Sequence, residues 1–207
     1  MVGGFINKFA NTIEYFKSLD SYIENNMREF TCSDICDIYS SMNKCLQEVK
    51  GNSNGFTGLS ELIIFRYLLK YIGGVFTQQA VEGSETLKEF SNGIYTVGQS
   101  CRIVLDGKRK YPDIMIKKNN EIISVIQIKV YVTNGVEEAK KEINDFKLFK
   151  SKYKNMKGFM IVFTEYGKES RIWKEFEEFS KQNTWFKSIM LGMNKNNFYN
   201  EIKEIID

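Results

Sequence analysis

The chain has 207 residues, 43% of them hydrophobic and 14% aromatic, which is enough apolar material for the core of one folded domain. Its formal net charge of +3 is mildly basic, so it permits a polyanionic partner without requiring one. The sequence contains no histidine, which excludes Ser-His-Asp triads, histidine-ligated zinc sites and histidine-metal nuclease sites within this chain.

The cysteines and the first residues predict a cytoplasmic protein. Cys32, Cys36, Cys45 and Cys101 form no CxxC pair and are too sparse for the disulfide scaffold of a secreted domain. Residues 1–16 lack a basic segment followed by an unbroken apolar run, and no apolar run approaches the ~18 residues of a membrane span. We therefore expect reduced, buried thiols and no membrane partner.

Residues 1–50 predict an N-terminal helical extension in the form of a helical hairpin. Apolar residues recur at three- and four-residue intervals from Phe5 to about Glu29, as in an amphipathic helix. Thr31 or Ser33 can cap a second helix. The apolar stripe of this second helix consists of Ile35, Ile38, Met42, Cys45, Leu46 and Val49.

An α/β domain over residues 56–207 follows the small polar segment Gly51–Gly55. Its core, residues 58–164, reads as a helix, strands in antiparallel connection, a helix and a strand. The last connection should be a right-handed crossover, which gives a mixed central sheet flanked by helices. The predicted helices are Gly58 to Ile72, Val136 to about Lys154, Lys168 to Lys181 and Phe198 to Ile206. The predicted strands are Val75 to Ala80, Gln99 to Leu105, two in Tyr111 to Val132, Gly158 to Thr164 and Phe186 to Leu191, while residues 82–98 are ambiguous.

The segment Tyr111 to Val132 predicts a hairpin that carries polar groups where a buried sheet should have none. Asn119-Asn120 joins its two strands, because asparagine tolerates left-handed turn geometry. Both faces of the second strand are mostly apolar, so we expect a central strand. This strand nevertheless contains Gln127 and Lys129.

Lys129 needs an anionic partner, because an unpaired ammonium in a buried strand costs several kcal/mol or loses its proton. The nearest candidate is Asp113 on the neighbouring strand, beside the single proline, Pro112. A structural ion pair at the end of the sheet is one interpretation of these two residues. A catalytic site is the other.

The pattern resembles the motif of the PD-(D/E)XK nuclease superfamily, with Pro112-Asp113 on one strand and Gln127-Ile128-Lys129 on the next. The resemblance covers roughly half of the chain, residues 58–164, in the αβββαβ element order of that superfamily. It implies a restriction-endonuclease-like fold and a metal-dependent DNA endonuclease, either resolvase-like or restriction-like. DNA is then the partner and Mg²⁺ or Mn²⁺ the cofactor, and a homodimer provides two sites for cuts on paired strands.

The resemblance also assigns roles to the motif residues. Asp113 is expected to be the principal metal ligand, assisted by the side-chain carbonyl of Gln127 and the backbone carbonyl of Ile128. Lys129 would orient or help deprotonate the attacking water and offset negative charge. An oxygen-bound Mg²⁺ suits this chemistry, because it serves the nucleophilic water, the charge on phosphorus and the leaving oxygen.

Gln127 stands where the family has a second carboxylate, which removes one negative charge from the site. Glu61, which the resemblance places on the first core helix, is a candidate replacement in the catalytic and metal site. It shares one side of that helix with Phe65 and Ile72, so it can face the sheet. Interaction with the helix N-terminus is the alternative role of Glu61. The substitution at Gln127 also keeps a second function open, a catalytically weak or inactive module that binds nucleic acid or a partner protein.

The parity of the hairpin decides whether these residues can meet. A regular two-residue loop at Asn119-Asn120 pairs Asp113 with Ile126, on the wrong sheet face for Gln127. We therefore predict an odd loop or a β-bulge, which brings Asp113 opposite Gln127 and onto the face of Lys129.

Overall fold

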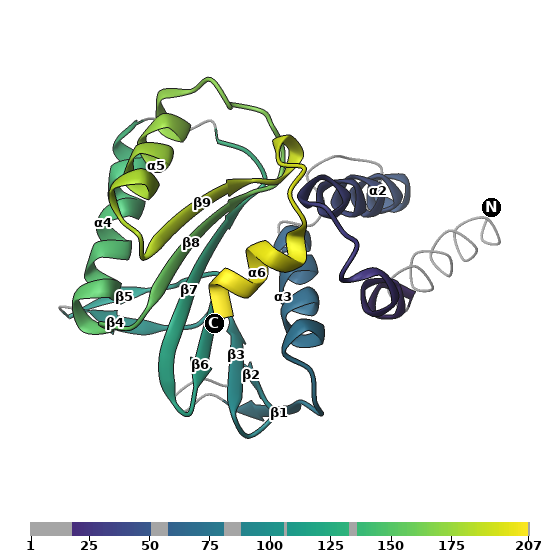
Figure 1. The fold of residues 1–207 in the computed structure, drawn as a ribbon, viewed down its shortest axis with the longest axis horizontal. Helices are drawn as coiled ribbons and strands as arrows, with labels where there is room; N and C mark the ends of the chain where they lie inside the picture. The colour runs from purple at the N-terminus through teal and green to yellow at the C-terminus, as the bar shows by residue number, and fades with distance from the viewer. Residues whose placement is uncertain (1–17, 51–57, 81–87, 106, 133–135, 207) are drawn as a thin grey trace.

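A seven-stranded mixed sheet with helices on both faces organises the chain (Figure 1). The structure is a computed structural model and describes residues 18–50, 58–80, 88–105, 107–132 and 136–206. The predicted boundary at Gly51–Gly55 and the first part of the first predicted helix lie outside these residues. None of the described helices is both long and apolar enough to cross a membrane.

The described elements follow the predicted order closely. Residues 18–26 are helical. The further helices are α2 (Cys32–Lys50), α3 (Leu59–Ile72), α4 (Val136–Lys152), α5 (Arg171–Gln182) and α6 (Phe198–Ile206), with a 3-10 turn η1 (Leu191–Met193). The strands are β1 (Thr77–Ala80), β2 (Lys88–Ser91), β3 (Tyr95–Gln99), β4 (Ile103–Leu105), β5 (Lys108–Lys110), β6 (Ile114–Lys118), β7 (Glu121–Lys129), β8 (Lys157–Val162) and β9 (Phe186–Met190).

The sheet has the strand order β1-β2-β3-β6-β7-β8-β9. From β1 to β7 neighbouring strands are antiparallel, whereas β7, β8 and β9 are parallel to one another. The predicted mixed sheet, the α/β class and the central position of β7 are therefore confirmed. A helix is needed to return the chain between parallel strands, and α4 and α5 serve this purpose.

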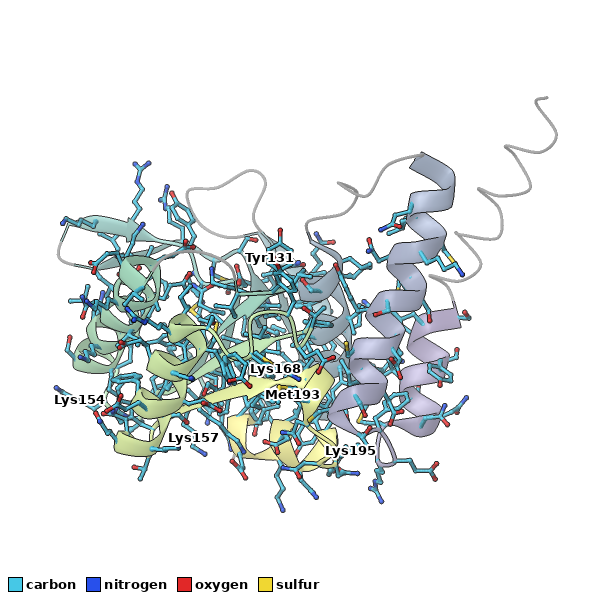
Figure 2. All side chains as sticks on the ribbon, turned by 90° about the horizontal axis from the view of Figure 1, so that it is seen from above. Tyr131, Lys154, Lys157, Lys168, Met193 and Lys195 are labelled. Atoms are coloured by element: carbon cyan, nitrogen blue, oxygen red, sulfur yellow. The ribbon has the colours of Figure 1, made fainter. Side chains whose placement is uncertain are left out.

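Two hydrophobic clusters fill the space between the sheet and its helices. The α3-side core joins α2, α3 and α6 to one sheet face and includes Ile114, Ile126 and Ile128. The α4-side core joins α4 and α5 to the other face and includes Met115 and Val125. The two helical layers are visible in Figure 1 and, seen from above, in Figure 2. Because side chains alternate along a strand, each residue of β6 and β7 can be assigned to one of the two cores.

The N-terminal helices are packed onto the α3-side core. Helix α2 begins with a reciprocal cap, in which the backbone N–H of Thr31 donates to Asp34 Oδ2 at 2.7 Å and that of Asp34 donates to Thr31 Oγ1 at 3.3 Å. Ile35 and Met42 of α2 are buried beside the sheet residues of this core. The second predicted helix and its cap at Thr31 are thus confirmed.

Helix α4 lies very close to the sheet because β8 has a glycine beneath it. A Cβ atom at Gly158 would lie 2.8 Å from Cδ1 of the Phe146 ring, closer than such atoms approach in proteins. The absence of a side chain therefore lets α4 pack tightly on β8. This packing fixes the position of α4, which faces the candidate site.

The predicted strand from Gln99 to Leu105 is wrong, because the chain turns at Ser100. Ser100 has a φ of +51°, and its backbone N–H donates to the Asp113 carbonyl at 2.8 Å. Strand β3 therefore ends at Gln99, and β4 pairs with β5 in a separate two-stranded sheet. The left-handed residue was not foreseeable from the apolar pattern, which continues through Cys101, Ile103 and Leu105 on the far side of the turn.

The hairpin β6–β7 contains the predicted bulge. Asn119 and Asn120 both have positive φ and form a two-residue turn, so Lys118 pairs with Glu121. The register then shifts between Ile116 and Lys117, and Ile114 pairs with Ile126. One further step along this register sets Asp113 opposite Gln127, as the parity argument required.

Candidate functional site

A pocket of about 630 Å³ lies between the end of β7, the start of α4 and the hairpin β4–β5. We call it the site pocket. Its walls carry Lys110 and Tyr111 from the end of β5, Asp113 before β6, Gln127, Ile128 and Lys129 from β7, and Glu137, Glu138, Lys141, Glu142, Asp145 and Phe149 from α4. Three of the four predicted catalytic side chains therefore meet in one pocket.

Asp113, Gln127 and Lys129 share the sheet face that is covered by α4. Residues two positions apart along a strand point to the same face. Asp113 therefore shares the face of Met115, and Gln127 and Lys129 share the face of Val125. Both Met115 and Val125 belong to the α4-side core. The condition that Asp113 and Lys129 lie on one face is satisfied. Ile128 points to the opposite core, and its backbone takes part in the site.

The Asp113 carboxylate extends the hydrogen-bond ladder between β6 and β7. The register of the two strands ends with the pair Ile114 and Ile126. The next free donor of β7 on this side is the backbone N–H of Ile128, which donates to Asp113 Oδ2 at 2.6 Å. This bond fixes the carboxylate against the end of β7, while its other oxygen is not engaged by it.

Asp113 is held in an environment that opposes its charge. The pKa of its carboxyl is raised to about 7, mainly by burial and to a smaller extent by the carboxylates of Glu61 and Glu142. The hydrogen bond from Ile128 and the ammonium of Lys129 lower the pKa, but they do not outweigh burial. Among the described residues no cation forms an ion pair with Asp113. A group of this kind in a pocket is a candidate functional group.

Lys129 has other partners than the predicted one. Its Nζ lies 2.6 Å from Glu142 Oε1 and 3.5 Å from Glu138 Oε1, both on α4, so the expected pairing with Asp113 is wrong. Burial lowers the pKa of the Lys129 ammonium, but the two glutamates outweigh burial and the net shift is upward. Lys129 is therefore a stable cation and hydrogen-bond donor rather than a proton acceptor.

Glu61 approaches the same end of the sheet from the other side. Its Oε2 accepts a hydrogen bond from Gln99 Nε2 at 3.3 Å, and Gln99 shares the strand face of Val97, which belongs to the α3-side core. Burial raises the pKa of Glu61, against the effect of the Gln99 hydrogen bond. Glu61 is not among the residues that line the site pocket. Its carboxylate is nevertheless close enough to raise the pKa of Asp113.

Glu138 and Glu142 were not among the predicted site residues. They lie one helical turn apart on α4, on the side that also carries Asp145 and Phe149. Glu138, Glu142 and Asp145, spaced by four and three residues, were present in the sequence as an acidic stripe beside the apolar positions Ala139, Ile143 and Phe146. That stripe is the signal that identifies α4 as a wall of the site.

The oxygen donors of the site suit a hard divalent cation. Within the described residues no group of three or more His, Cys, Asp or Glu side chains is arranged as a ready-made metal cage. Mg²⁺ rarely requires one, because it retains waters and binds through one or two carboxylates together with substrate phosphates. The half-buried carboxylate of Asp113, raised in pKa and in no ion pair with another described residue, is a suitable anchor, with the Gln127 amide and the Ile128 carbonyl as neutral oxygen donors beside it.

A scan against protein-family models and searches among curated proteins and solved structures found no match to this chain. The geometry of the pocket and the topology around it are therefore the basis for assigning a function.

Proposed function

We propose that the chain is a Mg²⁺-dependent DNA endonuclease with a restriction-endonuclease-like core. The observation that carries the proposal is the site pocket itself, in which Asp113, Gln127 and Lys129 meet on one sheet face and the pKa of the half-buried Asp113 carboxyl is raised to about 7. A carboxylate that is unfavourable without a cation, next to a stable ammonium, fits a site for a metal ion and a phosphodiester.

The topology supports the proposal. Helix α3 precedes the antiparallel neighbours β3, β6 and β7, and α4 then leads to the parallel strand β8. This order matches the αβββαβ order of the PD-(D/E)XK superfamily, with the hairpin β4–β5 inserted between β3 and β6, β1 and β2 added at one edge of the sheet and β9 at the other. Asp113, directly before β6, and Lys129, at the end of β7, correspond to the positions at which that superfamily carries its motif.

Each residue of the site would have a separate role in phosphodiester hydrolysis. Asp113 would hold Mg²⁺ with the Gln127 and Ile128 oxygens, and the ion would supply charge for the phosphate and an activated water. Glu142, and Glu61 from the other face, provide negative charge that Gln127 lacks. Lys129, aligned by Glu142 and Glu138, donates to the attacking water or to a phosphate oxygen.

Cleavage assays test this proposal directly. The protein is incubated with supercoiled, linear and four-way-junction DNA in Mg²⁺ or Mn²⁺ and, separately, in EDTA. We expect metal-dependent cleavage that Asp113→Ala and Lys129→Ala abolish. Matched changes at exposed residues, Asp37→Ala on α2 and Lys168→Ala after β8, should leave the rate unchanged. Equal loss in both pairs of variants would contradict the assignment.

The alternative is a nuclease-fold module that binds nucleic acid or a partner protein without cutting. The observation that favours it is the combination of Gln127 with a Lys129 whose charge is already balanced by Glu142 and Glu138. Salt-sensitive DNA binding without cleavage in any metal would support this module.

The endonuclease proposal includes a homodimer, because cutting both strands of a duplex needs two sites. Sedimentation with and without DNA measures the oligomeric state.

A further inference from the structure

The hairpin β4–β5, which we call the ribbon, stands apart from the main sheet and leads directly into the site pocket. It pairs Ile103 with Lys110, Val104 with Arg109 and Leu105 with Lys108. Lys110 and the following Tyr111 line the pocket, and Tyr111 is 54% exposed. Any ligand that lies on the ribbon can therefore continue into the site.

The inner face of the ribbon is anchored to the body of the protein. Ile103 and Leu105 are buried in the α4-side core. Lys110 forms an ion pair with Asp145 of α4, and Lys152 at the end of α4 donates to the Val104 carbonyl at 3.2 Å. Figure 1 shows the ribbon lying beside α4. It is a supported platform rather than an isolated loop.

The outer face of the ribbon is exposed and basic. Alternation along β4 turns Arg102 and Val104 away from the core, and Arg109 is the cross-strand partner of Val104. Arg102 and Arg109 are exposed, as is Lys108, which pairs with Leu105 at the end of the ribbon, and no ion pair holds these three within the part of the chain that the structure describes. The one acidic residue of the segment, Asp106, lies outside the described residues.

Three lysines line the site pocket, Lys110, Lys129 and Lys141. Asp145 neutralises Lys110 and Glu142 neutralises Lys129, whereas Lys141 of α4 is exposed and forms no ion pair among the described residues. The unpaired positive charge beside the pocket therefore lies on the ribbon and on Lys141. Two of the ribbon cations are arginines, whose planar donors suit the oxygens of a phosphate.

We propose that the outer face of the ribbon binds the sugar-phosphate backbone of duplex DNA and guides one strand into the site pocket. The inference rests on the proposed function in taking DNA as the ligand. A two-stranded ribbon is narrow enough to follow or enter the major groove of a duplex. Arg109 is four residues from Asp113, at most ~14 Å of extended chain. At 3.4 Å per base pair along one strand, its phosphate contact lies within about four base pairs of the scissile bond.

The test separates binding from cleavage by working in EDTA. Fluorescence anisotropy of a short labelled duplex is measured over a range of salt concentrations for the wild-type chain and for Arg102→Gln/Arg109→Gln. The matched control, Lys44→Gln/Lys203→Gln, removes the same charge from exposed positions on α2 and α6. Thermal unfolding of each variant verifies that the fold is retained, which we expect because all four side chains are exposed.

The ribbon variant should bind at least about tenfold more weakly near 0.1 M salt, and its plot of log K against log salt should lose about 2 from its slope. The control should match the wild-type chain. Equal effects in the two double variants, unchanged binding by the ribbon variant, or no salt-sensitive binding by the wild-type chain would each overturn the inference.

Cleavage in Mg²⁺ then distinguishes the two proposals. A wild-type chain that binds through the ribbon but never cuts would contradict the endonuclease and leave the ribbon assignment standing. A wild-type chain that cuts, together with a ribbon variant that binds normally, would do the reverse.

Discussion

Two clusters of lysine and glutamate in this molecule look alike and differ in their surroundings. In the Lys187 cluster, Lys187 of β9 lies 2.5 Å from Glu201 and 2.6 Å from Glu204, both on α6. In the Lys129 cluster, Lys129 of β7 lies between Glu142 and Glu138 of α4. Each cluster joins a strand to a helix, one on either side of the sheet.

The Lys129 cluster lines the site pocket, whereas the Lys187 cluster joins a buried carboxylate, that of Glu201, to a lysine at the surface. Glu201 is only 5% exposed and also accepts a hydrogen bond from Asn196 Nδ2 at 2.9 Å, so its charge is used to fix α6. Beside the Lys129 cluster lies Asp113, a further carboxylate without a cation and with its pKa raised to about 7. An ion pair alone therefore does not mark a site. The uncompensated carboxylate next to it does.

The largest expected effect comes from removing each lysine. Lys129→Met should lower metal-dependent cleavage by at least about a thousandfold, which is about 4 kcal/mol of activation free energy. Lys187→Met should instead leave cleavage intact at a temperature where the protein is folded. Its free energy of unfolding should fall by about 3 kcal/mol, because Glu201 is left buried and unpaired. Initial cleavage rates and urea unfolding measure the two effects.

The same pair of variants shows how far the comparison holds. Lys129→Met should destabilise the fold less than Lys187→Met does, because the Glu142 side chain is 18% exposed against 6% for Glu201 and can be hydrated through the pocket. If the stability losses are equal and cleavage is lost in neither variant, both clusters are merely structural.

Asp113→Asn tests whether the negative charge of Asp113 destabilises the folded protein. The pKa of Asp113 is about 7 in the folded protein and 3.8 in the unfolded chain, so the folded state binds the proton more tightly than the unfolded chain does. This contribution to stability is fully present below about pH 4 and is lost as pH rises through about 7. The asparagine variant has no proton to lose, and its Oδ1 can still accept from Ile128. It should therefore be more stable than the wild-type chain at pH 8, by up to about 4 kcal/mol.

Unfolding curves at pH 4 and pH 8 measure the change in this difference. We expect it to shrink to within about 1 kcal/mol at pH 4, where the folded Asp113 carboxyl is protonated and the pH lies close to the unfolded pKa of 3.8. A constant difference at both pH values would mean that Asp113 titrates normally and that the pocket does not oppose its charge.

Much of this site followed from local patterns in the sequence, and the missing parts depend on packing. The apolar alternation identified β7 as central, and parity alone required the bulge that brings Asp113 opposite Gln127. The partner of Lys129 was not predictable from the hairpin, because Glu142 reaches it only after α4 has packed on β8 over Gly158. The break at Ser100, and with it the ribbon, depended on a backbone hydrogen bond to Asp113 that no local pattern records.

Gln127→Glu should sharpen the difference in metal binding between the clusters. It restores a carboxylate beside Asp113, so Mn²⁺ and Mg²⁺ should bind about tenfold more tightly, which is about 1.4 kcal/mol. Asn196→Asp adds a carboxylate to the Lys187 cluster in the same way, next to Glu201. It should destabilise the fold without improving metal affinity, because Glu201 is buried and already paired with Lys187. Isothermal titration calorimetry measures the metal affinity of both variants. A gain in affinity in both would mean that the metal responds to added negative charge anywhere on the protein and not to the site pocket.

The smallest effect is expected for a lysine–glutamate pair that belongs to neither cluster. Lys140 Nζ lies 3.1 Å from Glu137 Oε1 on α4, but the two side chains are 53% and 89% exposed. Water and salt already screen such a pair, so Lys140→Ala should change the free energy of unfolding by less than about 0.5 kcal/mol. Urea unfolding at low and high salt measures it. Because Lys140 sits one turn before the middle of the same helix that carries Glu142, a large loss here would mean that α4 itself is fragile, and the effects at Lys129 would then reflect helix stability rather than the chemistry of the site.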